Sequence, residues 1–258
     1  MSKDKIVIAN WKMNLSLDET SKLIDEYINI FNKEEDFNRG NVVVCPNFLS
    51  LREAAEKFKD TILKTGSQNV FWENKGAYTS SVSPTMIKEV GCEYALISHS
   101  ECRKYLIENY AMAHRKVKSV LNLNGLTPIV CIGESWEERK TDKRDFVLVD
   151  QLQEALSGVS VMRNQEVIVA YEPIWAIGSG NAIEPQEAAY AHKIIRLALN
   201  NMFGVEVVSN NFKIIYGGSL TSENAPEFMK LDNIDGAIIG GASLKIEEFS
   251  KIAKIILN

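Results

Sequence analysis

The sequence has little of what would point away from an ordinary globular protein. Its 258 residues include 4 cysteines, 6 prolines and 3 histidines. The longest apolar runs, such as Ile6–Ala9 and Val42–Cys45, are the length of strands, far below the roughly 20 residues that a membrane span needs. We therefore expect no membrane partner. No apolar segment of secretory-signal length follows the first five residues, so a cytoplasmic location is expected.

Positive charge is also in short supply. Lys and Arg number 29 against 34 Asp and Glu, which gives a net charge of −5. Proteins that bind nucleic acid carry an excess of basic residues, so no nucleic-acid partner is expected. With 45% hydrophobic residues, the chain is too apolar to be disordered.

The four cysteines are Cys45, Cys92, Cys102 and Cys131, and no two of them have CxxC spacing. No histidine lies at ligand spacing from a pair of them. We expect reduced thiols that pack as small apolar side chains, with neither a disulfide nor a metal site.

Eight short runs of apolar or β-branched residues recur about every 33 residues, the length of one strand and one helix. Most are continuously apolar, which is typical of parallel strands buried on both faces. This rhythm predicts a single (β/α)8 barrel over residues 1–258, and a doubly wound open sheet is the alternative. The runs are Ile6–Ala9, Val42–Cys45, Thr61–Lys64, Tyr94–Ile97, Pro128–Ile132, Val167–Tyr171, Lys213–Tyr216 and Gly236–Ile239.

Helix signals lie between these runs. Ser16–Glu19 and Ser135–Glu138 have the pattern of capping boxes. Pro84 and Pro185 suit the first turn of a helix, and an apolar repeat predicts a last helix around Phe249–Ile256.

Ionisable residues follow three of the predicted strands. The first is followed by Asn10 and Lys12, the fourth by His99 and Glu101, and the sixth by Glu172. Strand ends meet at the mouth of a barrel, where its chemistry takes place. A buried carboxylate there is costly unless it is paired or used.

Each of these candidates also has a purely structural explanation. Lys12 fits a solvated loop lysine, and His99 fits a histidine that only satisfies hydrogen bonds. The other two histidines, His114 and His192, fall within helical patterns and are expected at the surface.

Glycine pairs follow the last two strands, at Gly217–Ser219 and Gly240–Gly241. They could serve only as tight turns. They also leave backbone N–H groups unobstructed where barrels often bind phosphate, and we favour a phosphate site.

The segment after Glu172 is apolar in its middle and rich in glycine at its end, which predicts a lid that closes over a ligand and expels water. A loop that packs permanently on its neighbours is the alternative. The segment comprises Pro173, Ile174, Trp175, Ala176, Ile177, Gly178, Ser179 and Gly180.

Six motifs together resemble the triosephosphate isomerase family over nearly the whole chain. They are Asn10–Asn14, His99–Glu101, Cys131–Glu134, Tyr171–Gly178, Tyr216–Ser219 and Ile239–Ser243. The resemblance implies interconversion of dihydroxyacetone phosphate and glyceraldehyde 3-phosphate through an enediolate, in glycolysis and gluconeogenesis, without metal or cofactor.

The resemblance also implies the role of each residue. Glu172 matches the general base, and His99 matches a neutral imidazole that polarises the carbonyl. Lys12 supplies positive charge, Asn10 orients the substrate, and Glu101 supports Lys12.

For the phosphate, the resemblance implies contacts from Gly178, Ser219, Gly240 and Gly241. It implies that Ile177 and Ile238 are apolar walls that press on Glu172 when the lid closes.

The sequence departs from the family pattern in two places. Ser98 and Cys102 flank the His99 motif where glycine and arginine are usual, and Thr79–Ser81 replaces Thr-Gly-Glu. Thr79–Ser81 lies in the loop that forms the dimer contact in the family, here around Val70–Pro84, so a homodimer through this loop is expected. Ser81 and Cys102 fit the joint loss of one ion pair, and drift in a loop is the alternative.

Two other functions stay open at this stage. Ser98 beside His99 leaves room for an isomerase of a four-carbon sugar phosphate. A catalytically silent barrel that binds phosphometabolites is the other, although such a protein needs no base.

Overall fold

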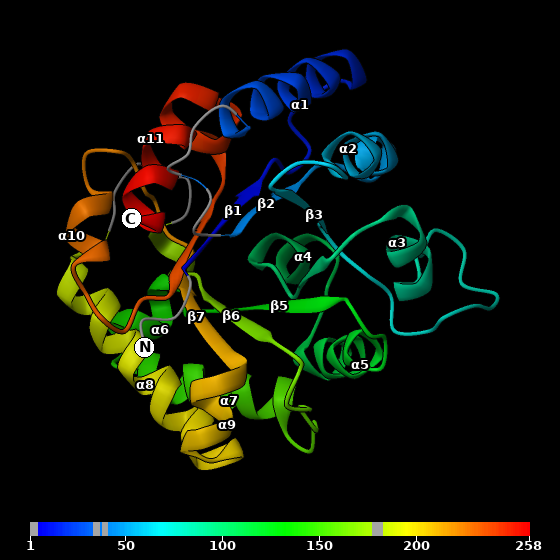
Figure 1. The fold of residues 1–258 in the computed structure, drawn as a ribbon. Coiled ribbons are helices and arrows are strands. Elements are labelled where there is room, and N and C mark those ends of the chain that lie inside the picture. The colour runs from blue at the N-terminus through cyan, green and yellow to red at the C-terminus, as the bar shows by residue number, and fades with distance from the viewer. Residues whose placement is uncertain (1–4, 33–36, 38–40, 177–182) are drawn as a thin grey trace.

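The eight strands form a closed parallel barrel in a computed structural model that describes residues 5–32, 37, 41–176 and 183–258. The barrel closes because β1 pairs with both β2 and β8 (Figure 1). The (β/α)8 prediction is confirmed, and the open-sheet alternative is wrong. The strands are β1 (Ile6–Asn10), β2 (Asn41–Cys45), β3 (Leu63–Ser67), β4 (Tyr94–Ile97), β5 (Thr127–Ile132), β6 (Val167–Tyr171), β7 (Phe212–Tyr216) and β8 (Gly236–Ile239).

Helices surround the barrel (Figure 1), and in the described part of the chain none is long and apolar enough to cross a membrane. The α-helices are α1 (Leu17–Phe31), α2 (Leu51–Phe58), α3 (Pro84–Val90), α4 (Ser100–Tyr105), α5 (Tyr110–Leu121), α6 (Trp136–Lys140), α7 (Arg144–Leu156), α8 (Pro185–Phe203), α9 (Val205–Asn211), α10 (Ala225–Met229) and α11 (Ile246–Leu257). Three short 3₁₀ helices are η2 (Phe48–Ser50), η3 (Ile174–Ala176) and η4 (Gly241–Leu244).

The predicted helix starts are confirmed. Ser16 and Ser135 each accept a hydrogen bond from the backbone N–H three residues on, and the glutamate there bonds back to the serine N–H. These reciprocal bonds satisfy donors that a helix start leaves free. Pro84 and Pro185 begin α3 and α8.

The strands are buried on both faces, which explains their continuous apolar runs. Along β1, Ile6 and Ile8 belong to the cluster inside the barrel, whereas Val7 and Ala9 belong to the larger cluster between barrel and helices. All four cysteines are free, and three of them are buried as expected. Cys102 differs because it is only partly buried.

The third strand was predicted too early. The run Thr61–Lys64 covers a bend and only the first part of β3, which continues to Ser67. The last three residues are polar or glycine, so hydropathy gives no strand signal there. A Cβ on Gly66 would lie 2.6 Å from the Cys45 Sγ, which shows how closely β3 passes β2.

The surface prediction for His192 is wrong. Its side chain is fully buried in α8, edge-on against the ring of Tyr171, and its Nδ1 lies 3.3 Å from the Asn233 carbonyl. Burial lowers the pKa of His192 to about 4. His114 is partly exposed in α5.

Candidate active site

The candidate residues from three strands meet at one hollow at the C-terminal end of the barrel. Its volume is about 270 Å³, which suits a small ligand. Four predicted polar residues line it, and so do the glycine turns after β7 and β8. The lining includes Asn10, Lys12, His99, Glu172, Gly217, Ser219, Ile238, Gly240 and Gly241.

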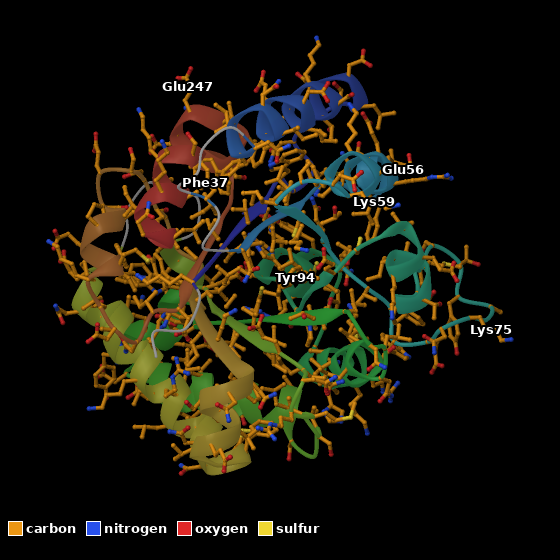
Figure 2. The ribbon with its side chains drawn as sticks, in the orientation of Figure 1. Phe37, Glu56, Lys59, Lys75, Tyr94 and Glu247 are labelled. Carbon is orange, nitrogen blue, oxygen red and sulfur yellow. The ribbon has the colours of Figure 1, made fainter. Side chains whose placement is uncertain are left out.

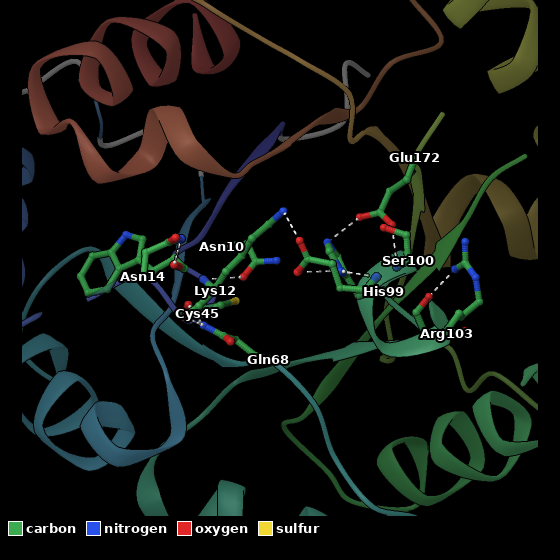
Figure 3. A network of polar contacts seen from close by, with 12 residues as sticks. Asn10, Lys12, Asn14, Cys45, Gln68, His99, Ser100, Arg103 and Glu172 are labelled. Atoms are coloured by element: carbon green, nitrogen blue, oxygen red, sulfur yellow. Dashed lines mark hydrogen bonds and ion pairs between the residues drawn. The ribbon is translucent and has the colours of Figure 1, made fainter. Parts of the chain in front are cut away.

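Glu172 and His99 contact each other at the edge of this hollow (Figure 3). The Glu172 Oε1 lies 3.1 Å from the His99 Nε2. Its other oxygen, Oε2, accepts a hydrogen bond of 3.2 Å from the backbone N–H of Ser100 at the start of α4. The Glu172 side chain is only 2% exposed, so these donors hold a carboxylate that water barely reaches.

The contacts of His99 assign its proton. The backbone N–H of Glu101 donates to the His99 Nδ1 over 3.2 Å, so Nδ1 acts as an acceptor. A neutral imidazole with its proton on Nε2 satisfies this bond and also donates to Glu172. The fold therefore presents an N–H donor at Nε2 toward the hollow.

Two glycines make room for Glu172. A Cβ on Gly217 would lie 2.9 Å from the Glu172 Cγ and 3.0 Å from the Ile238 Cγ2. A Cβ on Gly133, whose φ is 159°, would lie 1.8 Å from the Glu172 carbonyl oxygen. A larger residue at Gly217 would displace the Glu172 side chain, and one at Gly133 would displace the Glu172 backbone.

Lys12 has an unusual backbone conformation, with φ at 54°, which only a few per cent of non-glycine residues adopt. Side chains hold it there. Its N–H donates to the Asn10 Oδ1 over 3.1 Å, and Gln68 Nε2 donates to its carbonyl over 2.9 Å. Its Nζ pairs with the Glu101 Oε1 at 2.7 Å. The ammonium also lies near Gly240, where a Cβ would be 3.7 Å from Nζ.

The glycine turns after β7 and β8 also border the hollow. A Cβ on Gly241 would meet no atom within 4 Å, so its backbone faces open space. The Ser219 hydroxyl donates to the Ala176 carbonyl over 2.9 Å, which links this turn to the start of the predicted lid. Gly178, which is also a predicted phosphate contact, lies outside the described residues.

The described part of the predicted lid, Pro173–Ala176, is tied to Glu134 at the end of β5. Trp175 Nε1 donates to the Glu134 Oε1 over 3.0 Å, and Tyr171 donates to the same oxygen over 3.2 Å. Burial raises the pKa of Glu134 above its usual range. Ile177, Gly178, Ser179 and Gly180 lie outside the described residues, so the lid stays a prediction.

Sequence reasoning missed a buried ion pair behind His99. Lys116 Nζ lies 2.7 Å from the Glu108 Oε2, and both side chains are at most 6% exposed. The Glu108 Oε1 accepts the Ser98 N–H over 3.0 Å and so holds Ser98 with φ at 60°. Glu108 follows Leu106 and Ile107, which are exposed, and no sequence pattern marks it as buried.

Among the residues that the structure describes, no group of three or more His, Cys, Asp or Glu side chains could hold a metal ion.

Comparisons with known proteins agree on one family. The sequence model described as "Triosephosphate isomerase" matches residues 5–256. The chain is 42% identical over 250 residues to the triosephosphate isomerase of Dictyoglomus thermophilum, covering 97% of this chain and 98% of that protein. It is 43% identical over 247 residues to that of Caldanaerobacter subterraneus subsp. tengcongensis, covering 96% and 97%. For Thermodesulfovibrio yellowstonii the identity is 37% over 250 residues, covering 97% and 98%.

Proposed function

Since the chain belongs to the triosephosphate isomerase family, we propose that the hollow at the mouth of its barrel is where its chemistry takes place. The protein is an isomerase that interconverts dihydroxyacetone phosphate and D-glyceraldehyde 3-phosphate, a step of glycolysis. We extend this role to gluconeogenesis, because the reaction is reversible. One catalytic domain over residues 1–258 is part of the proposal.

Glu172 is the base that moves the proton. Its carboxylate removes a proton from the carbon beside the carbonyl, and the C–H electron pair forms the carbon–carbon double bond of an enediolate. Glu172 then returns a proton to the neighbouring carbon, while His99 passes the hydroxyl proton from one substrate oxygen to the other. The carbonyl thereby moves by one carbon, and the reaction has no net oxidation. A positioned general base typically contributes a factor of about 10²–10⁴.

His99 and Lys12 stabilise the oxygen that becomes negative. The proton on the His99 Nε2 points toward Glu172 across 3.1 Å, and a substrate carbonyl placed between them takes over this donor. The Lys12 ammonium adds positive charge from the other side of the hollow, and Asn10 fixes its backbone. Donors held in place before the reaction lower its barrier because they need no reorganisation.

The phosphate is held by backbone N–H groups of Ser219, Gly240 and Gly241, with Gly178 from the lid. Lys12 beside Gly240 supplies charge for the same group. Closure of residues 173–180 protects the enediolate from water, with Ile177 and Ile238 as walls around Glu172. The scheme requires no metal or cofactor.

The observation that carries the proposal is the pairing of Glu172 with the His99 Nε2 beside a glycine-lined hollow. A coupled assay on purified protein tests it with three-carbon and four-carbon ketose phosphates as substrates. We expect turnover of dihydroxyacetone phosphate and little of the four-carbon compound. A preference for the four-carbon compound would overturn the assignment of dihydroxyacetone phosphate as the substrate. Ser98, which raised that alternative, is not among the described residues that line the hollow.

The homodimer rests on the surface around the loop from Val70 to Pro84. This loop extends away from the barrel with Lys75 at its end (Figure 2). A groove of about 330 Å³ beside it is lined by Val70, Trp72, Ser81 and Leu106, among others. Large exposed apolar side chains such as Phe48 and Leu106 line this groove, and apolar side chains of this kind at the surface are typical of protein interfaces.

Light scattering after gel filtration measures the oligomeric state. We expect a dimer for the wild type and a monomer for Leu106→Asp, since a charge in the groove would be buried without a partner. A monomeric wild type would contradict this assignment. Two statements stay predictions. One is that Ser81 and Cys102 together replace an ion pair, and the other is the cytoplasmic location.

A further inference from the structure

One buried hydroxyl joins two loops of the site that are far apart in the sequence. Tyr27, in α1, donates to the carbonyl of Ser243 over 2.6 Å. Its oxygen accepts a bond of 3.4 Å from the Nε1–H of Trp11. Trp11 lies between Asn10 and Lys12, whereas Ser243 belongs to η4 after β8. Tyr27 and Ser243 are fully buried, and Trp11 is 1% exposed.

The Ser243 end of this chain continues into the phosphate turn. The N–H of Ser243 donates to the Gly240 carbonyl over 2.8 Å, and the Ser243 hydroxyl donates to the same oxygen over 2.7 Å. These bonds close the turn Gly240–Ser243. The Tyr27 hydroxyl therefore holds the turn from behind.

The Trp11 end fixes the segment that carries Lys12. The Trp11 N–H donates to the Cys45 carbonyl over 3.1 Å, and the Asn14 side chain donates to the Trp11 carbonyl over 2.8 Å. Only one residue later, the Lys12 ammonium lies near Gly240 on the hollow side. The two segments thus meet twice, through Lys12 and Gly240 at the hollow and through Tyr27 behind it.

Packing leaves the Tyr27 ring little freedom. It lies edge-on to Trp11 and contacts the rings of Phe31 and Phe249, all with centroids between 5.2 and 5.7 Å from its own. Figure 1 shows α1, which carries Tyr27 and Phe31, beside α11, which carries Phe249. Burial raises the pKa of Tyr27 well above its usual value, so the hydroxyl remains a donor at working pH.

From this geometry we infer that Tyr27 is a positioning residue for phosphate recognition, because its hydroxyl sets the spacing between the Lys12 segment and the turn Gly240–Ser243. The inference rests on the proposed function, which assigns the phosphate to this turn and to Lys12. A chain of hydrogen bonds in a dry interior holds such spacing better than apolar packing alone, because it is directional.

The test is Tyr27→Phe, which removes one oxygen and keeps the ring. We expect the KM for dihydroxyacetone phosphate and the inhibition constant of inorganic phosphate to rise together by about fivefold to tenfold, the size of one or two lost hydrogen bonds. The kcat should change by less than about twofold, because Glu172 and His99 do not contact Tyr27. Tyr94→Phe, at the opposite end of the barrel, is the matched control and should change neither constant.

Other outcomes separate the possibilities. A lower melting temperature with unchanged phosphate inhibition would show a purely structural role and overturn the inference, and so would an equal loss in kcat. If Tyr27→Phe does not fold, Trp11→Phe removes the weaker bond and leaves a smaller aromatic ring in its place. We then expect a rise of about twofold to threefold in both constants, and no rise would overturn the inference. A wild-type protein without triose phosphate turnover would instead overturn the proposed function.

Discussion

The two ends of the barrel place ionisable groups in opposite ways. At the C-terminal mouth, Glu172, His99 and Lys12 surround a hollow of about 270 Å³. At the N-terminal end, Lys213 pairs with Glu166 at 2.7 Å, and Lys64 pairs with Glu93 at 3.1 Å.

Tyr94 belongs to the inward-facing cluster at the N-terminal end and lies near the middle of the view in Figure 2. Burial raises its pKa above the usual value, and the neighbouring Glu166 and Glu93 add to this effect. The charged residues named at this end pair with opposite charges on adjacent elements, and these pairs stabilise the fold. At the mouth, the Nε2 of His99 and the carboxylate of Glu172 contact each other beside the hollow.

The same substitution at the two ends gives the largest expected contrast. Glu172→Gln should lower turnover by about 10²–10⁴-fold, because the amide cannot take up the proton, while the fold stays intact. Glu166→Gln is the matched control at the N-terminal end and should leave turnover within about twofold. Steady-state kinetics with circular dichroism measures both. A folded Glu172→Gln variant with full activity would remove Glu172 as the base.

Two buried histidines sharpen the comparison. His99 uses both ring nitrogens within the site, whereas the Nε2 of His192 has no hydrogen-bond partner among the described residues. The pKa of His192 falls from 6.5 to about 4. Between these values the unfolded chain binds a proton that the native protein does not, so stability falls as pH drops from 6.5 to 4, by about 3 kcal/mol in total.

Urea unfolding at several pH values between 4 and 7 measures this effect. His192→Gln cannot be protonated and should flatten the pH dependence of the unfolding free energy over this range. An unchanged slope would assign the acid sensitivity to other groups.

The smallest effects are expected from the paired charges at the N-terminal end. Lys213→Met leaves the partly buried Glu166 alone and should lower the unfolding free energy by about 1–2 kcal/mol, between the costs for exposed and buried pairs. Lys64→Met, whose pair is more exposed, should cost less than about 0.5 kcal/mol. Thermal unfolding measures both, and turnover should stay constant. A loss of activity in Lys213→Met would mean that this end also serves catalysis.

Sequence patterns predict an element or a site residue where the residue type itself shows its place in the fold. Strands buried on both faces are visible as apolar runs, and Glu172 and His99 stand directly after two of them. Patterns failed where close packing determines the residue type. The end of β3 has no apolar signal because its last three residues are polar or glycine, and the close approach of Gly66 to Cys45 leaves no room for a larger side chain there.

Long-range hydrogen bonds were also invisible in the sequence. Tyr27 lies among the buried, mostly apolar residues of α1, and the sequence does not show that its hydroxyl reaches a carbonyl 216 residues away. Lys116 and Glu108 are buried only because each neutralises the other, and nothing in a single sequence pairs them.

Isomerisation of dihydroxyacetone phosphate in D₂O, followed by NMR, tests the central claim most directly. If Glu172 takes the proton and returns one after exchange with solvent, glyceraldehyde 3-phosphate carries deuterium at the carbon beside its aldehyde, and Glu172→Gln abolishes this labelling. Labelling at an undiminished rate in a folded Glu172→Gln variant would contradict proton transfer through Glu172.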